Sequence, residues 1–254
     1  MKSLVSRFIN KIEFERISRF KRHKRGSTVL FGKKIDFVDS VTFLHGYNEI
    51  FADEIYKFKS NVTSPLIIDC GSNIGLSIIF FKKLFPNSKV IGFEPDPEIF
   101  EVLKSNIEAL GYKNIELHNF AIWKEDKMMD FRSEGGYSGR LVLPSDNSTY
   151  KVQATKLSNF ISSQQVDFLK LDIEGAELDV VSSIEKQLNM VNNLFIEYHA
   201  PSKESQKLST LLSVLEENGF RYYIKEAYSP KNPFLEVNDL DGMDLQLNIS
   251  CIRK

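Results

Sequence analysis

Residues 65–96 have the order strand, glycine turn, helix, strand, and this order constrains the fold more than any other part of the chain. The apolar, β-branched run 66–70 is typical of a buried parallel strand. Gly71 and Gly75 follow it, a helical pattern comes next, and a second apolar strand ends directly at Glu94. The segment therefore predicts the β-α-β unit of an α/β protein.

The glycine turn and Glu94 together predict a nucleoside ligand. Glycine lets the backbone approach a ligand closely, and a carboxylate at the tip of the second strand can accept both hydroxyls of a ribose. The turn lacks the G-x-G-x-x-G spacing that cradles a pyrophosphate, and its acid would repel phosphate but suits an ammonium group. S-adenosylmethionine has a ribose and an amino-acid head and no phosphate. The residues expected to bind it are Asp69, Gly71, Ser72, Asn73, Gly75 and Glu94.

Four stretches of the chain resemble one known family. They are IIDCGSNIGLS, VIGFEPDPEIFEVLKSNI, VDFLKLDIEGAELDVV and LFIEYH, and the pairing of DIEGAE with a downstream EYH is the most specific feature. From about Pro65 to Phe220 the chain resembles the FkbM family of S-adenosylmethionine-dependent O-methyltransferases. The resemblance implies a Rossmann-like, seven-stranded class I methyltransferase sheet with helices on both faces and an antiparallel closing strand.

The resemblance also implies roles at the ends of two later strands. In such folds the third strand ends beside the adenine ring, so Asn119 and the backbone near Ala121 are candidates for cofactor binding; an ordinary strand end is the alternative. Asp172 would end the fourth strand, beside the transferable methyl group. The acceptors of such enzymes are sugars of surface polysaccharides and glycolipids, or natural-product hydroxyls.

The apolar pattern continues the alternation of strands and helices beyond the first unit. It predicts helices over 97–110 and 205–218, a helix whose first turn holds Glu174 and Glu177, and strands over 114–123, 166–173, 193–199, 220–225 and 245–252.

Residues 124–156 interrupt this alternation. Strands over 128–131 and 150–154 flank a Gly- and Ser-rich insertion, and such an insertion beside a site is typically a functional loop. Tyr137 and Arg140 are expected to bind the acceptor there, since a guanidinium matches phosphate or carboxylate groups. A solvated loop arginine is the alternative.

Methyl transfer to a hydroxyl needs a base or a metal ion, because a sugar hydroxyl does not ionise unaided at neutral pH. The candidate catalytic residues are Asp172 at one strand tip and Glu197 and His199, which share one side of the next strand. In one hypothesis neutral His199 is the base, with Asp172 as its partner or as the base itself. In another, Asp172, Glu197 and His199 bind Mg²⁺ or Mn²⁺, which lowers the pKa of the hydroxyl. The sequence leaves both open.

The amino-terminal part is expected to form an α/β appendage, with domains at 1–60 and 61–254. Residues 1–25 form a basic amphipathic segment, which either contacts an anionic membrane surface or a partner subunit, or packs on its own domain. Residues 28–60 begin as a hairpin around Gly32 and Lys33. They continue either as a lid over the cofactor or as a structural cap on the sheet.

Composition and charge exclude several classes of protein. The net charge of −1 argues against a broad nucleic-acid footprint. No apolar run approaches the roughly 18 residues of a membrane span, and no secretory signal is evident, so a cytoplasmic protein is expected. Cys70 and Cys251 fall in predicted strands and are expected to be core residues rather than a disulfide or a zinc site. The sequence does not decide whether the chain forms a homo-oligomer.

The sequence as a whole predicts an S-adenosylmethionine-dependent O-methyltransferase. Its acceptor is expected to be a hydroxyl of a sugar (surface polysaccharide, glycolipid or nucleotide-linked precursor) or of a similar small polar molecule. An NAD(P)-dependent oxidoreductase is the alternative enzyme, disfavoured by the missing G-x-G-x-x-G, and a non-catalytic cofactor-binding scaffold is a third reading. Amino-group methylation of nucleic acid is disfavoured because Asp172 is followed by Ile-Glu-Gly and not by Pro-Pro-Tyr.

Overall fold

A seven-stranded sheet forms the centre of the computed structural model, which describes residues 13–133, 139–141, 150–161, 164–235, 239–240 and 242–253, with backbone alone at 132–133 and 139–141. Its strands are β3 (Leu66–Cys70), β4 (Lys89–Phe93), β5 (Ile115–His118), β10 (Val166–Leu171), β11 (Val191–Pro201), β12 (Phe220–Tyr228) and β13 (Met243–Arg253), in the order β12-β13-β11-β10-β3-β4-β5. Strand β13 runs antiparallel to both neighbours, and the other pairings are parallel. This confirms the expected sheet and its antiparallel closing strand.

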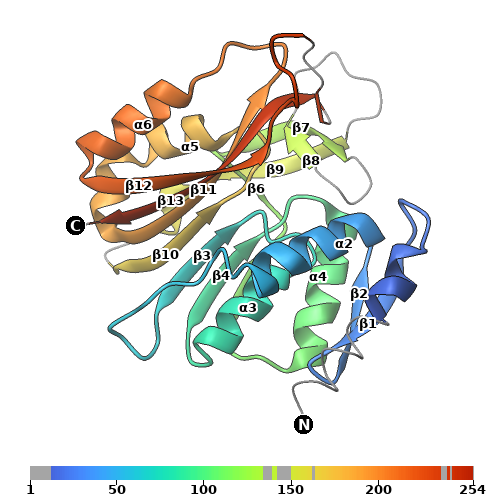
Figure 1. Cartoon of the computed structure of the whole chain (residues 1–254). Coiled ribbons are helices and arrows are strands. Elements are labelled where there is room, and N and C mark those ends of the chain that lie inside the picture. The colour runs from blue at the N-terminus through green and yellow to red at the C-terminus, as the bar shows by residue number, and fades with distance from the viewer. Residues whose placement is uncertain are drawn as a thin grey trace.

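Helices cover both faces of this sheet, as expected (Figure 1). On one face lie α2 (Ser40–Tyr47), α3 (Leu76–Leu84) and α4 (Pro97–Leu110), and on the other lie α5 (Glu177–Ser183) and α6 (Leu208–Glu217), with short helical turns at Asn48–Ala52, Leu157–Asn159 and Glu185–Met190. Each face has its own apolar core. The end signals are local: Asp96 caps α4 through the N–H groups of Glu98 and Ile99, and Gly111 ends it in a left-handed conformation.

The described amino-terminal residues pack on the α3–α4 face. Strands β1 (Gly26–Leu30) and β2 (Lys33–Phe37) pair antiparallel around a two-residue turn with positive φ at Phe31 and Gly32, which confirms the hairpin. Residues 13–18 are helical, and Ile17 is buried in the same core as residues of α3. Residues 1–12 lie outside the described part, so membrane contact and the domain boundary at residue 60 stay predictions. No helix among the described residues is long and apolar enough to cross a membrane.

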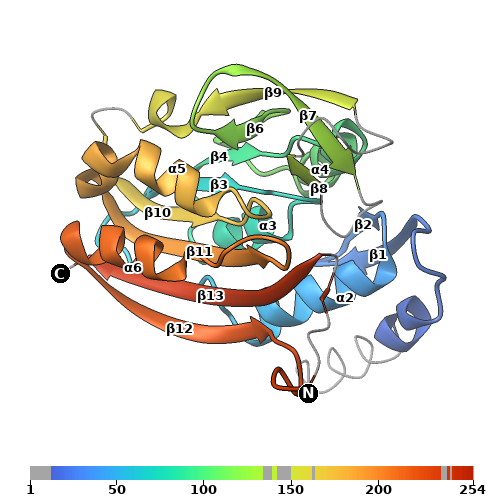
Figure 2. The same ribbon diagram turned by 90° about the horizontal axis from the view of Figure 1, so that it is seen from above.

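A second, four-stranded sheet lies beyond the β4 side of the main sheet (Figure 2). It consists of β6 (Ala121–Trp123), β7 (Lys127–Ser133), β8 (Gly139–Leu141) and β9 (Tyr150–Lys156), in the order β6-β9-β7-β8. The prediction of a single strand over 114–123 was wrong. This segment forms two strands, β5 and β6, which belong to different sheets. The amide of Asn119 donates to the carbonyl oxygens of Glu94 and Pro95, which holds the chain at the turn between them.

The segment between β10 and α5 also differs from the sequence expectation. Strand β10 ends at Leu171, and Glu174 and Gly175 have positive φ, so Glu174 lies in a loop and not in a first helical turn. The reason is the carboxylate of Glu177, which accepts hydrogen bonds from the N–H groups of Ile173 and Gly175 and holds the loop open. Glu177 itself begins α5.

Candidate active site

A cavity of about 220 Å³ opens at the carboxyl ends of β3, β4, β10 and β11. Ligands of open α/β sheets bind at this edge. The predicted site residues that line it are Gly71, Ser72, Asn73, Glu94, Ala121, Asp172, Glu197 and His199. Asp69, Gly75 and Asn119 are not among the residues that line it. Tyr137 and the side chain of Arg140 lie outside the described residues.

Two glycines shape the loop between β3 and α3. Gly71 has φ +87°, and a Cβ on it would lie 1.9 Å from the carbonyl oxygen of Asp172. Gly75 has φ +95°, and a Cβ there would lie 2.8 Å from Leu103. Only glycine combines this backbone conformation with this close approach. The loop is therefore pressed against the tip of β10.

Glu94 is a buried carboxylate at the tip of β4 that faces the cavity. Its two oxygens accept hydrogen bonds of 2.9 Å from the N–H groups of Asn73 and Asp96. Burial raises the pKa of Glu94 from 4.5 to about 8, against the lowering effect of these two hydrogen bonds. The side chain is thus fixed in place and retains acceptor capacity toward a ligand.

Asp69 does not line the cavity, although the sequence suggested it as a ligand-binding acid. Its carboxylate accepts a 2.5 Å hydrogen bond from Ser77 and lies 3.4 Å from the ammonium of Lys170. Lys170 also donates to the carbonyl of Gly71 at 2.8 Å and lies 3.1 Å from the carboxylate of Asp172. Burial alone would lower the pKa of Lys170, but Asp172 and Asp69 hold it well above its usual value.

Sequence reasoning overlooked Lys170, which joins the glycine loop to the strand tip. The available signal was a lysine inside the apolar run of β10, where a charged side chain has to find a partner. Lys170 is 2% exposed and lines the cavity.

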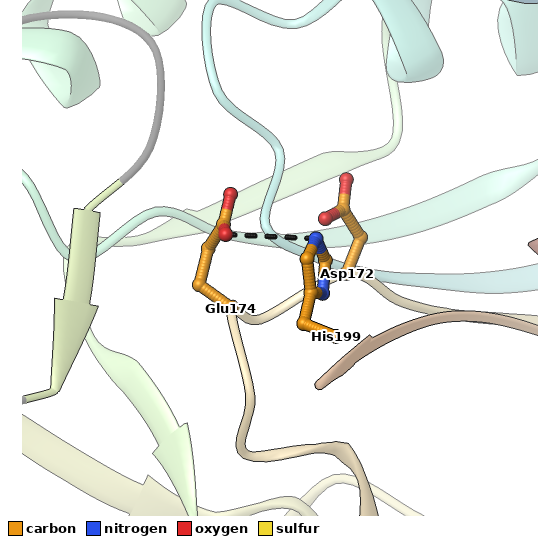
Figure 3. A group of neighbouring side chains, drawn as sticks. All are labelled: Asp172, Glu174 and His199. Carbon is orange, nitrogen blue, oxygen red and sulfur yellow. Dashed lines mark ion pairs between the residues drawn. The ribbon is translucent and has the colours of Figure 1, made fainter. Parts of the chain in front are cut away.

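His199 lies among several carboxylates, of which Figure 3 shows Asp172 and Glu174. Its Nδ1 is 3.1 Å from the carboxylate of Glu177, and its Nε2 is 3.5 Å from Glu174 and 3.7 Å from Glu197. The Glu197–His199 proximity confirms that these side chains share one side of β11. The sequence explained Glu177, and Glu174 in part, as carboxylates of a first helical turn; in the structure Glu174 has positive φ and precedes α5.

The charges around His199 alter its acid–base character. Burial alone would lower the pKa of His199, but Glu174, Glu177 and Glu197 raise it well above the usual value. Burial, and then Asp172, raise the pKa of Glu197 well above that of an ordinary glutamate. These three carboxylates therefore favour the protonated imidazole over the neutral one, and the role of His199 as a base stays a prediction.

One subset of these residues has the spacing of a metal site. Among the described residues, ligand atoms of Asp172, Glu174 and His199 all lie within 4.8 Å of one another. Glu197, which the sequence suggested as a ligand, is not part of this subset, and Glu174 takes its place.

Helix α2 and the turn after it form the outer wall of the cavity. Thr42, Gly46 and Ile50 line it, together with His45 and Glu49, whose side chains are 3.2 Å apart. Residues 28–60 therefore contribute both to the core and to the cavity, and whether they move as a lid stays a prediction.

Comparison with known proteins finds methyltransferases, both among family models and among individual relatives. Residues 69–222 match the model of the methyltransferase FkbM domain. The chain is 26% identical over 206 residues to methyltransferase 1 of Beauveria bassiana, covering 71% of this chain and 81% of that protein. It is 26% identical over 155 residues to the 2-O-methyltransferase NoeI of Sinorhizobium fredii, covering 53% and 63%.

The fold has a counterpart among solved structures. The crystal structure of a putative transferase, PH0793 of Pyrococcus horikoshii, superposes with a TM-score of 0.51 at 12% identity, covering 92% of this chain and 74% of that one. At this identity the likeness concerns the fold alone. The matched domain model spans most of the chain and includes the glycine loop, Glu94, Asp172 and His199. This chain belongs to the FkbM methyltransferase family.

Proposed function

We propose that the protein transfers a methyl group from S-adenosylmethionine to a hydroxyl of a small polar acceptor, with sugars as the first class to test. The observation that carries the proposal is the shared cavity: the glycine loop and Glu94 line the same space as Asp172, Glu197 and His199. A site for the methyl donor and a site for an acid–base step thus adjoin. Family membership favours this reading over the oxidoreductase and scaffold alternatives.

The described residues fit the methyl donor on three counts. Glu94 presents a buried carboxylate that suits two ribose hydroxyls. Phe120, Ala121 and Ile122 offer apolar surface for a planar base. The loop between β3 and α3 lines the cavity with Gly71, Ser72 and Asn73, and Gly71 lets it pack directly on the carbonyl of Asp172. When bound, S-adenosylmethionine supplies an electrophilic methyl group on a sulfonium.

Glu197 is the residue proposed to take the proton of the acceptor hydroxyl. Its raised pKa makes it a stronger base than an ordinary glutamate, and it faces the cavity from β11. Asp172 orients the hydroxyl from β10, where Lys170 fixes its carboxylate. On transfer, the acceptor oxygen would gain the methyl group, the electron pair of the broken carbon–sulfur bond would pass to sulfur, and Glu197 would keep the proton.

Two features support a hydroxyl acceptor. The outer wall carries Thr42, His45 and Glu49, whose polar groups suit hydroxyl recognition. The similarity to a protein named 2-O-methyltransferase favours oxygen as the methylated atom. Arg140 and Tyr137 are retained as proposed acceptor contacts.

The test is a transfer assay with S-adenosylmethionine labelled in the methyl group and a panel of free sugars, glycolipids and nucleotide-linked sugars. We expect an O-methyl product by NMR, and for Glu197→Gln a kcat lower by about 10²–10⁴-fold with unchanged affinity for S-adenosylhomocysteine. Glu204→Gln, at an exposed position, is the matched control. Methylation at nitrogen or carbon, or full activity of Glu197→Gln, would contradict the proposal.

A further inference from the structure

We infer that Asp172, Glu174 and His199 bind one divalent cation, with Mn²⁺ preferred over Mg²⁺, in the wall of the cavity. The predicted use of the ion rests on the proposed function, whereas its binding does not. The ligand set differs from the one expected from the sequence, because Glu174 replaces Glu197.

The spacing of the three side chains fits a single ion (Figure 3). Their ligand atoms lie within 4.8 Å of one another. Two ligands on opposite sides of an ion with bonds of about 2.1–2.4 Å are roughly 4–5 Å apart, so small side-chain movements complete the site. The three residues come from the tip of β10, the loop after it and β11, which leaves the cavity side of the ion open.

The second nitrogen of His199 is held as in metal sites. Its Nδ1 lies 3.1 Å from Glu177, whose carboxylate is fixed by the N–H groups of Ile173 and Gly175. A metal-bound histidine commonly donates its other ring N–H to a carboxylate in this way. The Nε2 atom therefore points at Glu174, at 3.5 Å, and this distance exceeds that of a hydrogen bond. His199 is 4% exposed, so a buried ring nitrogen is aimed into the proposed site.

The carboxylates of the site outnumber the basic side chains that pair with them, which favours a bound cation. Two basic side chains among the described residues, Lys170 and His199, make ion pairs with this cluster of carboxylates. The carboxylates are Asp69, Asp172, Glu174, Glu177 and Glu197. Partly buried carboxylates without compensation are costly. A divalent ion compensates them better than the single charge of a sulfonium.

Asp172 can serve Lys170 and the ion together. Its Oδ2 is the atom 3.1 Å from the lysine ammonium, and a carboxylate has a second oxygen with its own lone pairs. The mixture of oxygen and imidazole ligands favours Mn²⁺ over Mg²⁺, because Mg²⁺ prefers oxygen alone. The ion would polarise the acceptor hydroxyl and ease transfer of its proton to Glu197.

The test is a titration of the full-length protein, freed of metal with EDTA, with Mn²⁺ alone, followed by the loss of the free-ion EPR signal. We expect one bound ion per chain in the wild type and binding at least about 10-fold weaker in Glu174→Gln, as for loss of a ligand. Glu204→Gln serves as the matched surface control, and Glu197→Gln, which removes a nearby charge but no ligand, should weaken binding less than Glu174→Gln does. Both are expected to retain the ion.

Titration of the same samples with S-adenosylhomocysteine separates the two proposals. A wild type that binds S-adenosylhomocysteine but no Mn²⁺, or a Glu174→Gln variant that binds Mn²⁺ as tightly as the wild type, overturns the metal site and leaves the proposed function standing. If Glu197→Gln weakens Mn²⁺ binding as much as Glu174→Gln does, the proposed ligand set is overturned. Mn²⁺ binding without any S-adenosylhomocysteine binding supports the metal site and removes the proposed function instead.

Discussion

A Cβ atom on Gly71 would lie 1.9 Å from the carbonyl oxygen of Asp172. The loop proposed to bind the methyl donor and the strand tip proposed to hold the acceptor are therefore in direct backbone contact. Lys170 reinforces this contact, since its ammonium binds the carbonyl of Gly71 and the carboxylate of Asp172 together.

Gly71→Ala should both destabilise the protein and abolish cofactor binding. The alanine methyl group would force the loop away from β10, at a cost of about 3 kcal/mol or more in unfolding free energy. Gly111→Ala is the matched control, because Gly111 also has positive φ but has open space where a Cβ would lie. Its expected cost is about 1 kcal/mol, with normal binding of S-adenosylhomocysteine. Equal effects of the two changes in urea unfolding and calorimetry would contradict this account.

Lys170→Met should cost about 3–5 kcal/mol of unfolding free energy, because it leaves buried carboxylates without their counter-charge. Neutralising one of them in the double variant Asp69→Asn/Lys170→Met should recover about 1 kcal/mol or more relative to the sum of the single changes. Urea unfolding of the four proteins in the cycle measures this coupling. Strict additivity would show that Asp69 and Lys170 do not interact.

Binding of S-adenosylhomocysteine should strengthen as pH rises toward 8.5. Burial raises the pKa of Glu94 from 4.5 to about 8, and an ionised carboxylate is the better acceptor for ribose hydroxyls. We expect binding about 10-fold tighter at pH 8.5 than at pH 6.5, and no such change in Glu94→Gln. A wild type with pH-independent binding would argue against contact between Glu94 and the ligand.

The raised pKa of Glu94 has the opposite effect on the ligand-free protein, whose stability should fall as pH rises. Between pH 4.5 and about 8 the folded state holds a proton on Glu94 that the unfolded state has lost. The contribution of Glu94 to unfolding free energy is therefore greatest below pH 4.5 and falls as pH rises through this window. Urea midpoints of the wild type and Glu94→Gln, compared across this range, isolate the contribution.

Asn106→Leu should loosen the amino-terminal hairpin from the glycine loop. The buried amide of Asn106 donates to the carbonyls of Asp36 and Ile74, and its oxygen accepts from the N–H of Asp36. Leaving these groups unpaired should cost about 2–3 kcal/mol. A single cooperative transition in urea is expected, because both segments share one core. Separate transitions for the two segments would support an independent domain boundary near residue 60.

The parts of the site predicted from the sequence are those encoded by local patterns. Gly71 and Glu94 follow their strands directly and Gly75 immediately precedes α3, so the apolar runs on either side fix their positions at the sheet edge. Period-two spacing placed Glu197 beside His199 in the same way.

The parts that sequence reasoning misplaced depend on contacts between distant segments. Glu174 lies beside His199 because β11 pairs with β10, which brings the loop after β10 next to the end of β11. Lys170 has its role because β10 pairs with β3, which brings Asp69 beside it. Neither pairing has a local signature. Likewise, the break at Asn119 depends on carbonyl groups 24 and 25 residues earlier in the chain.

Calorimetric titration of the protein with S-adenosylhomocysteine, without added metal, tests the central claim most directly. We expect one molecule bound per chain with a dissociation constant on the order of micromolar. At pH 8.5, where Glu94 is largely ionised, binding should weaken about 100-fold in Glu94→Ala, because charge-assisted hydrogen bonds are lost, and stay unchanged in Glu101→Ala, at an exposed position on α4. Absence of binding by the wild type, or equal binding by Glu94→Ala, would contradict the account.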